Sequence, residues 1–414
     1  MIEPLIRSLI LLLALLGHFG WWVFAYNRIN ATGLPRNWVK FFEKVLCVPL
    51  TLLIPLVISF NDGSGLLRWV QTGQWPDSLS SFAFCYLIFS VAVVLCIGPL
   101  WLASRLYLIP PKQLKQSSLI QRLDLRHRRK ELCSGAITNG LAILPGNDIL
   151  SIECHRKSLV LSNWPSYLDG FRIGHISDLH FTGHLHPDFY RIAFAELQSL
   201  RPDCIALTGD IIDKQKCLPW ITDLLGNLEA KHGKFFVLGN HDKRLPNTEA
   251  IRERLRDGGW TDLGSRVVPT NIHGLPILLA GHELPWFGSE PSISPYKTDP
   301  GYSSENQSDS FRLALAHSPD AFDWAQREGI HLLLAGHTHG GQVRLPGIGP
   351  IVAPSWYGSK FASGVFYRKP TLMHVSRGLA GIHPLRFRCA PEIAILELQS
   401  SHSSPSGNFA ESRE

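Results

Sequence analysis

The 414-residue sequence predicts an α/β domain preceded by an α-helical transmembrane region. The chain is 45% hydrophobic but only 18% charged, whereas soluble domains average about 25% charged residues. Its first 104 residues contain three long runs without Asp, Glu, Lys or Arg. From about residue 150, short apolar runs alternate with helical stretches, which is the pattern of an α/β domain.

The net positive charge is confined to the front of the chain. Residues 1–130 carry 14 basic and 5 acidic residues, which leaves 26 of the 40 basic and 29 of the 34 acidic residues for the remainder. A mildly acidic remainder argues against the clustered positive charge of a DNA- or RNA-binding domain, so we expect no nucleic-acid-binding surface. Basic residues beside apolar segments favour membrane lipids as partners instead.

The three uncharged runs predict membrane-spanning helices, each of which takes about 20 residues. They place the spans within residues 1–110, at about 8–26, 45–61 and 82–104. The first run could be a signal peptide, but it lacks a small-residue cleavage site and ends in an aromatic group typical of the membrane interface. The second is short and contains Pro49 and Pro55, so a re-entrant or kinked segment is the alternative.

The basic residues of the predicted loops indicate the topology. Four follow the first span, one follows the second, and seven lie between residues 112 and 130. Because short loops rich in Lys and Arg stay in the cytoplasm, we expect a multi-pass protein of the inner cell membrane with a cytoplasmic catalytic domain. Residues 111–150 would be a basic linker, acting either as a headgroup-binding segment or as a topogenic signal alone.

The eight cysteines are scattered, and no two form a CxxC pair. This pattern excludes a zinc ribbon and argues against a disulfide framework. Free thiols agree with a reducing compartment for the C-terminal part.

Residues 151–399 are expected to form the α/β domain. Apolar runs predict strands at Phe171–Ser177, Cys204–Thr208, Lys234–Leu238, Phe311–Ala316 and His331–Ala335. Helical spacing or composition predicts helices at Pro187–Leu200, Pro219–Ala230, Thr248–Asp257 and Ala321–Glu328. Further strands are expected at Arg266–Val268 and Pro276–Ala280, which would form a hairpin, and at Leu372–Ser376 and Ile393–Leu398. Residues 289–310 read as a loop, and residues 400–414 as a disordered tail.

Polar side chains gather where the predicted strands end. The candidate ligands are Asp178, His180, Asp210, Asn240, His317, His337 and His339. Ligands bind at the carboxyl ends of strands in open α/β sheets, so these loops would face one site. Asp, His and Asn without a thiolate suit divalent Mn, Fe, Co, Zn or Ni. Seven ligands are too many for one ion, so we expect a two-metal centre in which one carboxylate, most naturally Asp210, bridges the ions.

Each motif alone is weak, because Asp-x-His and Gly-Asp also occur in ordinary turns. The ordered series, however, resembles the calcineurin-like metallophosphoesterases and is especially similar to their membrane-linked bacterial phosphodiesterase branch. The matching motifs are DLH at 178–180, GDIID at 209–213, GNHD at 239–242, His317, and GHTHGGQ at 336–342. The resemblance covers approximately residues 165–398. It implies a β-sandwich of two mixed sheets flanked by helices, rather than the single doubly wound sheet that the strand pattern alone suggests.

The resemblance also implies a role for each polar residue. One divalent ion (Mn, Fe, Zn or similar) would be held by Asp178, His180, Asp210 and His339, and a second by Asp210, Asn240, His317 and His337. His241 would be catalytic, stabilising the phosphoryl charge and protonating or orienting the leaving oxygen. Asp213 and Asp242 would orient the ligands through hydrogen bonds, although Asp242 could equally be a loop-capping carboxylate.

The implied function is a membrane-anchored dimetal phosphodiesterase, in which a metal-bridging hydroxide attacks phosphorus in a phosphodiester or phospholipid-like substrate. The alternatives are UDP-2,3-diacylglucosamine hydrolysis in lipid A synthesis, an inactive phosphoesterase-fold scaffold, and a transporter or sensor with an appended domain. All seven ligands are present, which argues against the scaffold. The second and third spans lack charged residues, which argues against the transporter.

The sequence also offers candidates for the lining of the substrate cleft. His184, His186 and His282 are candidates, with solvated loop histidines as the alternative. Trp286 and Phe287 could meet an acyl chain or a nucleobase, with plain packing as the alternative. Gly281-His282-Glu283 stands where this branch is expected to have a carboxylate-rich turn.

Overall fold

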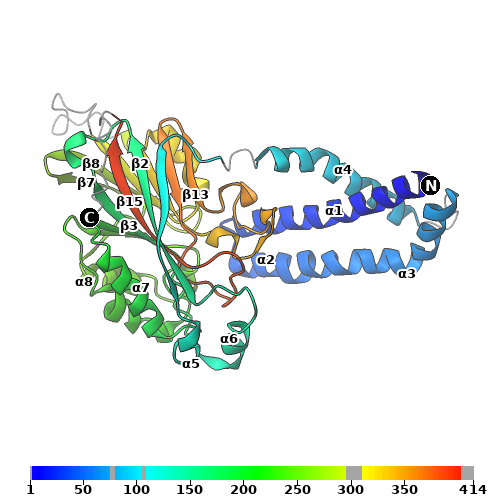
Figure 1. Cartoon of the computed structure of the whole chain (residues 1–414), viewed down its shortest axis with the longest axis horizontal. Coiled ribbons are helices and arrows are strands. Elements are labelled where there is room, and N and C mark those ends of the chain that lie inside the picture. The colour runs from blue at the N-terminus through cyan, green and yellow to red at the C-terminus, as the bar shows by residue number, and fades with distance from the viewer. Residues whose placement is uncertain (1, 75–79, 105–108, 295–309, 402–414) are drawn as a thin grey trace, which may run out of the picture. The chain divides into compact units, whose positions relative to one another are not determined.

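The computed structural model describes residues 2–74, 80–104, 109–294 and 310–401. The chain divides into two compact units (Figure 1). One comprises residues 1–109 together with Pro354–Lys360, and the other comprises residues 110–353 and 361–414.

Long apolar helices build the first unit. α1 spans Ile2–Asn30 and α4 spans Ser81–Ser104. Between them, α2 (Arg36–Phe41), a π-helical turn (Phe42–Cys47) and α3 (Val48–Thr72) form one helical stretch, which continues through Pro49 and Pro55. In the part of the chain that the structure describes, three helices are long and apolar enough to cross a membrane, by length and composition: Ile2–Asn30, Arg36–Thr72 and Ser81–Ala103. The three predicted spans lie within them.

Polar contacts join the helices of this unit. The buried His18 lies 2.6 Å (Nδ1) from the hydroxyl of Tyr86 and 2.9 Å (Nε2) from the carbonyl oxygen of Thr51. Asp62 accepts hydrogen bonds from the backbone N–H and the hydroxyl of Ser80. Helix α3 therefore extends past the predicted end of the second span and includes a buried acidic residue.

The second unit is a sandwich of two mixed sheets flanked by helices (Figure 1). The seven-stranded sheet has the order β1-β2-β15-β3-β4-β5-β6, with strands Leu114–Asp124, Ser151–Leu161, Glu392–Ser400, Phe171–Ile176, Cys204–Thr208, Lys234–Val237 and Trp260–Asp262. The six-stranded sheet has the order β13-β14-β10-β9-β8-β7, with strands Gly364–Arg368, Thr371–Val375, Leu332–Ala335, Phe311–Ala316, Leu275–His282 and Val267–Ile272. The two-sheet architecture implied by the resemblance is confirmed, and the single doubly wound sheet is wrong.

Alternation along β15 shows how the layers pack. Successive side chains of a strand point to opposite faces of its sheet. Ala394, Leu396 and Leu398 accordingly join the core between the two sheets, whereas Ile393 and Ile395 join the second core, beneath the helices. That second core receives apolar residues from α7 (Pro187–Ser199) and α8 (Glu249–Asp257). On the six-stranded sheet, α10 (Phe322–Glu328) contacts β14.

The linker predicted at 111–150 is wrong, because this segment belongs to the sandwich. β1 pairs antiparallel with β2 from Leu114↔Leu159 to Asp124↔Ser151. The short helices α5 (Arg129–Leu132) and α6 (Gly135–Leu141) follow. β1 is an edge strand with mostly exposed side chains, so basic and polar residues are tolerated there and no apolar run marks it.

Most other predicted elements match to within one or two residues. The exceptions are Arg266–Val268, where β7 continues to Ile272, and Pro219–Ala230, where the regular structure is a π-helical turn over Ile221–Leu225. The predicted 289–310 loop falls largely, and the 400–414 tail almost entirely, outside the described residues; Ser400 itself ends β15.

Candidate metal centre

The carboxyl ends of β3, β4, β5, β9 and β10 bring all seven candidate ligands together. Among the described residues, two groups consist of candidate ligands whose donor atoms lie within 4.8 Å of one another: Asp178, His180, Asp210 and His339 in the first, and Asp210, His317 and His337 in the second. A third such group is formed by His180, Asp213 and His241. Asn240 joins the second group, since its Oδ1 lies 3.1 Å from His317 Nε2. Asp210 is common to the first two groups.

The two carboxylate oxygens of Asp210 serve different groups. Oδ2 lies 3.5 Å from His180 Nε2, and Oδ1 lies 3.3 Å from His317 Nε2. Beside Oδ2, the Nε2 atoms of His180 and His339 are 3.1 Å apart. Beside Oδ1, His337 Nδ1 and His317 Nε2 are also 3.1 Å apart. Asp210 is therefore placed to bridge two adjacent sets of oxygen and nitrogen donors.

Three imidazole rings are oriented by hydrogen bonds to the nitrogen that faces away from the donor groups. The Nδ1 of His180 bonds Asp213 Oδ2 at 2.7 Å. His317 Nδ1 contacts the Thr208 carbonyl at 2.7 Å, and His339 Nδ1 contacts the Ala380 carbonyl at 3.1 Å. An acceptor at Nδ1 fixes the proton there and leaves the Nε2 lone pair free, which is the arrangement of metal-binding histidines. The donor set therefore fits divalent cations.

Backbone conformation at the ligands is unusual. Five of them have positive φ angles: Asp178 (53°), His180 (45°), Asp210 (52°), His337 (71°) and His339 (51°). L-residues rarely adopt this left-handed region, and such strain concentrates at functional sites. Gly239, which precedes Asn240, must also be glycine, because a Cβ there would lie 2.3 Å from Asp210 Oδ1. The glycines of the motifs thus allow the loops to approach one another.

His241 lies beside the metal-ligand groups and is held by three contacts. Its backbone N–H donates to Asp210 Oδ1 at 2.7 Å, and its Nδ1 bonds Asp213 Oδ1 at 2.5 Å. Its Nε2 contacts a guanidinium nitrogen of Arg244, which also pairs with Asp213 at 2.9 Å. Arg244 was not singled out from the sequence, although its position three residues after His241 could have suggested it.

Asp242 contacts backbone rather than ligand side chains. Its Oδ1 accepts from the N–H groups of Ile211 and Ile212 at 2.9 and 3.0 Å, and its Oδ2 accepts from Gly239 N–H at 2.8 Å. It therefore ties together the loops that follow β4 and β5, as a loop-capping carboxylate does.

Burial and charge shift the protonation of these groups in opposite directions. Burial raises the pKa of Asp210, but the charges of His317 and His241 outweigh it and hold that pKa well below its usual range. Burial lowers the pKa of His317, yet the Asp210 carboxylate raises it to about 9. For His241 burial dominates, and its pKa falls to about 4.

The residues suggested for the cleft lie in different surroundings. Trp286 covers the second donor group, with its ring centroid 4.9 Å from His337 and 5.4 Å from His317. Phe287 packs against the core beneath the helices, and His282 packs against Trp324. Glu283 accepts from Leu238 N–H at 2.6 Å and pairs with Arg252, so it braces the end of β5.

The remaining two histidines contact residues outside the donor groups. His184 lies 3.2 Å from the hydroxyl of Thr138 on α6, and His186 bonds Asp188 at 3.2 Å on the surface.

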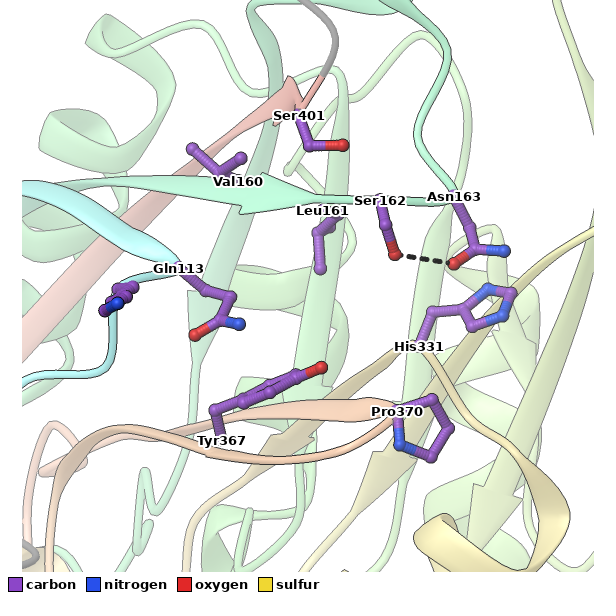
Figure 2. Close-up of a pocket in the computed structure, with 10 residues that line it drawn as sticks. Gln113, Val160, Leu161, Ser162, Asn163, His331, Tyr367, Pro370 and Ser401 are labelled. Atoms are coloured by element: carbon purple, nitrogen blue, oxygen red, sulfur yellow. Dashed lines mark hydrogen bonds between the residues drawn. The ribbon is translucent and has the colours of Figure 1, made fainter.

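A separate cavity of about 250 Å³ lies at the opposite ends of the strands (Figure 2). Gln113, Asn163, His331 and Tyr367 are among its lining residues. Its described lining residues include no carboxylate, so they do not offer the donor set found at the metal centre.

Comparisons with known proteins agree with this geometry. Residues 171–341 match the calcineurin-like phosphoesterase family. The metallophosphoesterase YkuE of Bacillus subtilis is 31% identical over 61% of this chain and 87% of its own length. Phosphodiesterase YaeI of Escherichia coli is 29% identical over 55% of this chain and 82% of its own. UDP-2,3-diacylglucosamine pyrophosphatase LpxG of Chlamydia muridarum is 24% identical over 56% and 84%.

The matched segment contains all seven candidate ligands and both sets of donors, as expected for enzymes that use two divalent metal ions. By motif, geometry and similarity, this chain belongs to the calcineurin-like metallophosphoesterases, which are metal-dependent hydrolases of phosphate esters.

Proposed function

We propose that the protein is a membrane-anchored phosphodiesterase whose two metal ions are bridged by Asp210. The observation that carries this proposal is the division of the Asp210 oxygens between two donor groups. Asp178, His180 and His339 would complete the first metal site, and Asn240, His317 and His337 the second. When bound, two divalent ions supply Lewis acidity and a water of lowered pKa.

The side chains around the two sites would bind and orient the substrate. His241, fixed through Nδ1 by Asp213, would contact the phosphoryl group with Nε2, and in its protonated form would donate the Nε2 proton to the leaving oxygen. Arg244 places a guanidinium beside that nitrogen and would attract the negative charge of the substrate. Trp286 packs against His317 and His337 and would exclude bulk water from one side of the centre.

The similarity to phosphodiesterase YaeI supports phosphodiesters as substrates. The similarity to LpxG favours a second candidate, hydrolysis of UDP-2,3-diacylglucosamine. With either activity, the apolar helices of the first unit would anchor the protein to a membrane. The Lys and Arg residues between positions 112 and 130 would keep the catalytic domain in the cytoplasm.

The test uses the full chain in detergent, stripped of metal and then reloaded with Mn²⁺. We expect faster hydrolysis of bis(p-nitrophenyl) phosphate than of p-nitrophenyl phosphate, and loss of both activities on chelation. Preference for the monoester would overturn the phosphodiesterase proposal. UDP-2,3-diacylglucosamine in mixed micelles tests the second candidate, which requires that this lipid be cleaved faster than the artificial diester.

A further inference from the structure

Exposed apolar side chains gather on two neighbouring segments of the catalytic domain. On α6 and the turn after it, Ile137, Ile143 and Leu144 are 77%, 63% and 47% exposed. On the hairpin formed by β11 (Arg344–Leu345) and β12 (Gly349–Pro350), Leu345 and Ile348 are 39% and 45% exposed. Contiguous apolar surface on a folded domain marks a site of interaction.

Phe387 joins these two segments into one surface. Asn147, at the end of the turn after α6, forms a β-bridge with Phe387, and so does Val343, just before the hairpin. The Phe387 carbonyl also accepts from Arg344 N–H at 3.0 Å. We call Ile137, Ile143, Leu144, Leu345, Ile348 and Phe387 the apolar rim.

The apolar rim is continuous with the metal centre. The hairpin follows directly on His339 and Gln342, and Gln342 Nε2 donates to the His383 carbonyl, four residues before Phe387. On the other side, Thr138 of α6 contacts His184, four residues after the ligand His180. The rim therefore lies near the loops that carry His180 and His339.

Exposed basic residues accompany the rim, although residues 131–414 carry more acidic than basic residues. Lys130 precedes α6, and Arg388 follows Phe387. Lys214 and Lys216 are also exposed, and a Cβ on Gly183 would lie 3.2 Å from Lys216 Nζ, which places this lysine beside His184. Apolar residues combined with local positive charge suit the surface of an anionic bilayer.

Chain connectivity limits the distance between the start of the catalytic domain and a membrane. β1 begins at Leu114, ten residues after α4 ends at Ser104, and ten residues span at most about 36 Å when fully extended. If α4 crosses a bilayer, Leu114 stays within that distance of the headgroups. Because β1 runs parallel to β3, Leu114 lies at the strand ends opposite the metal centre.

We propose that the apolar rim inserts into the headgroup region of an anionic lipid bilayer and so presents the metal centre to phosphoesters that lie in the membrane plane. The docking step itself requires only the rim and its basic neighbours. Delivery of a membrane-plane substrate rests on the proposed phosphodiesterase function.

The experiment measures lipid contact in the full chain. Ile143→Cys or Ile348→Cys carries an environment-sensitive fluorophore, in a background where the exposed Cys85 and Cys96 are replaced by serine. The labelled protein is reconstituted into vesicles of about three parts phosphatidylcholine to one part phosphatidylglycerol, with nitroxide-labelled lipid as quencher. The matched control is Tyr167→Cys, which is 64% exposed and precedes β3, at the strand ends opposite the metal centre.

We expect probes at 143 and 348 to be quenched several-fold more strongly than the probe at 167, because inserted residues lie about 5–10 Å into the headgroup boundary. Pure phosphatidylcholine should weaken the quenching. Leu144→Asp should weaken quenching of the probe at 348, whereas Tyr167→Asp should not. Equal quenching at all three positions would overturn the proposal, as would blue-shifted emission at 143 without quenching, which would mean that protein covers the rim.

Hydrolysis of bis(p-nitrophenyl) phosphate in the same vesicles separates the two proposals. It should be unchanged in Leu144→Asp, which lies outside the metal centre. Loss of quenching with intact hydrolysis would overturn docking alone, and quenching without any hydrolysis would overturn the phosphodiesterase alone.

Discussion

The backbone N–H of His241 donates a 2.7 Å hydrogen bond to Oδ1 of Asp210. The residue proposed to act on the substrate is thereby fixed to the residue proposed to bridge the metal ions. A substitution at either residue can therefore affect the other. The first two predictions separate their roles by measuring metal content.

Asp210→Asn should lower the metal content of the purified protein and abolish hydrolysis. A neutral amide cannot balance two dications, and its nitrogen cannot act as a ligand. Elemental analysis and the diester assay measure the two effects. Asp188→Asn, an exposed aspartate on α7, is the matched control and should behave as wild type. Full occupancy of both metal sites in Asp210→Asn would contradict the assignment.

His241→Asn should keep both metal ions but slow turnover by about 10²- to 10⁴-fold, as is typical when a general acid is lost. The defect should be larger for alkyl or sugar phosphate esters, whose leaving groups need a proton, than for nitrophenyl esters. His186→Asn provides a surface control. The proposed role fails if the variant loses a metal ion or cleaves poor-leaving-group esters at the wild-type rate.

Asp213→Asn should weaken the first metal site and slow catalysis together. Its two oxygens bond His180 and His241, and an asparagine can accept from only one of them. Loss of a ligand-orienting carboxylate typically costs about 10- to 100-fold in metal affinity. Titration of the metal-free protein with Mn²⁺ checks this, and an affinity equal to that of His241→Asn would argue that Asp213 acts only through His241.

Glu392→Gln should destabilise the catalytic domain. Glu392 forms a 2.6 Å ion pair with Lys157 in the interior, and removing one partner of such a pair costs about 3–5 kcal/mol. Thermal unfolding measures the loss. The double variant Lys157→Met/Glu392→Gln leaves no unpaired charge of this pair, so it should recover much of the stability. Equal destabilisation in both variants would show that packing rather than charge is responsible.

A fluorescent protein fused after residue 414 should fold and fluoresce, whereas alkaline phosphatase fused there should be inactive, because it works only outside the cytoplasm. The prediction rests on four and seven basic residues in the two segments expected inside, against one in the loop expected outside. The reverse pair of results would invert the topology.

The metal centre could be predicted because its residues follow short apolar strands in a fixed order. Strands such as Cys204–Thr208 and Phe311–Ala316 are fully recognisable as buried runs, and the glycines beside Asp210 and His337 mark the tight turns. Arg244 was missed because its contact with His241 depends on the 3₁₀ turn Asp242–Arg244, and its spacing of three residues from His241 was its only signal in the sequence.

The strands that sequence reasoning missed contain charged residues. β2 includes Arg156 and Lys157, which look like surface residues, yet the ammonium of Lys157 is buried against Glu392 and His374 from distant strands. Such compensation is long-range and cannot be read from a local pattern. β1 was missed because it lies at the edge of its sheet, where most of its side chains are in solvent and no apolar run marks the strand.

The left-handed backbone at Asp178, His180, Asp210, His337 and His339 affects which substitutions these positions would accept if the protein no longer had to hydrolyse its substrate. At each of these positions an L-residue with positive φ lowers the stability of the fold. Glycine would remove that conformational cost, but it would also remove the donor atom. Selection for stability and selection for activity therefore oppose one another at these five positions. A descendant that no longer needed hydrolysis would be expected to acquire glycine or asparagine there first, and to melt at a higher temperature as its metal centre disappeared.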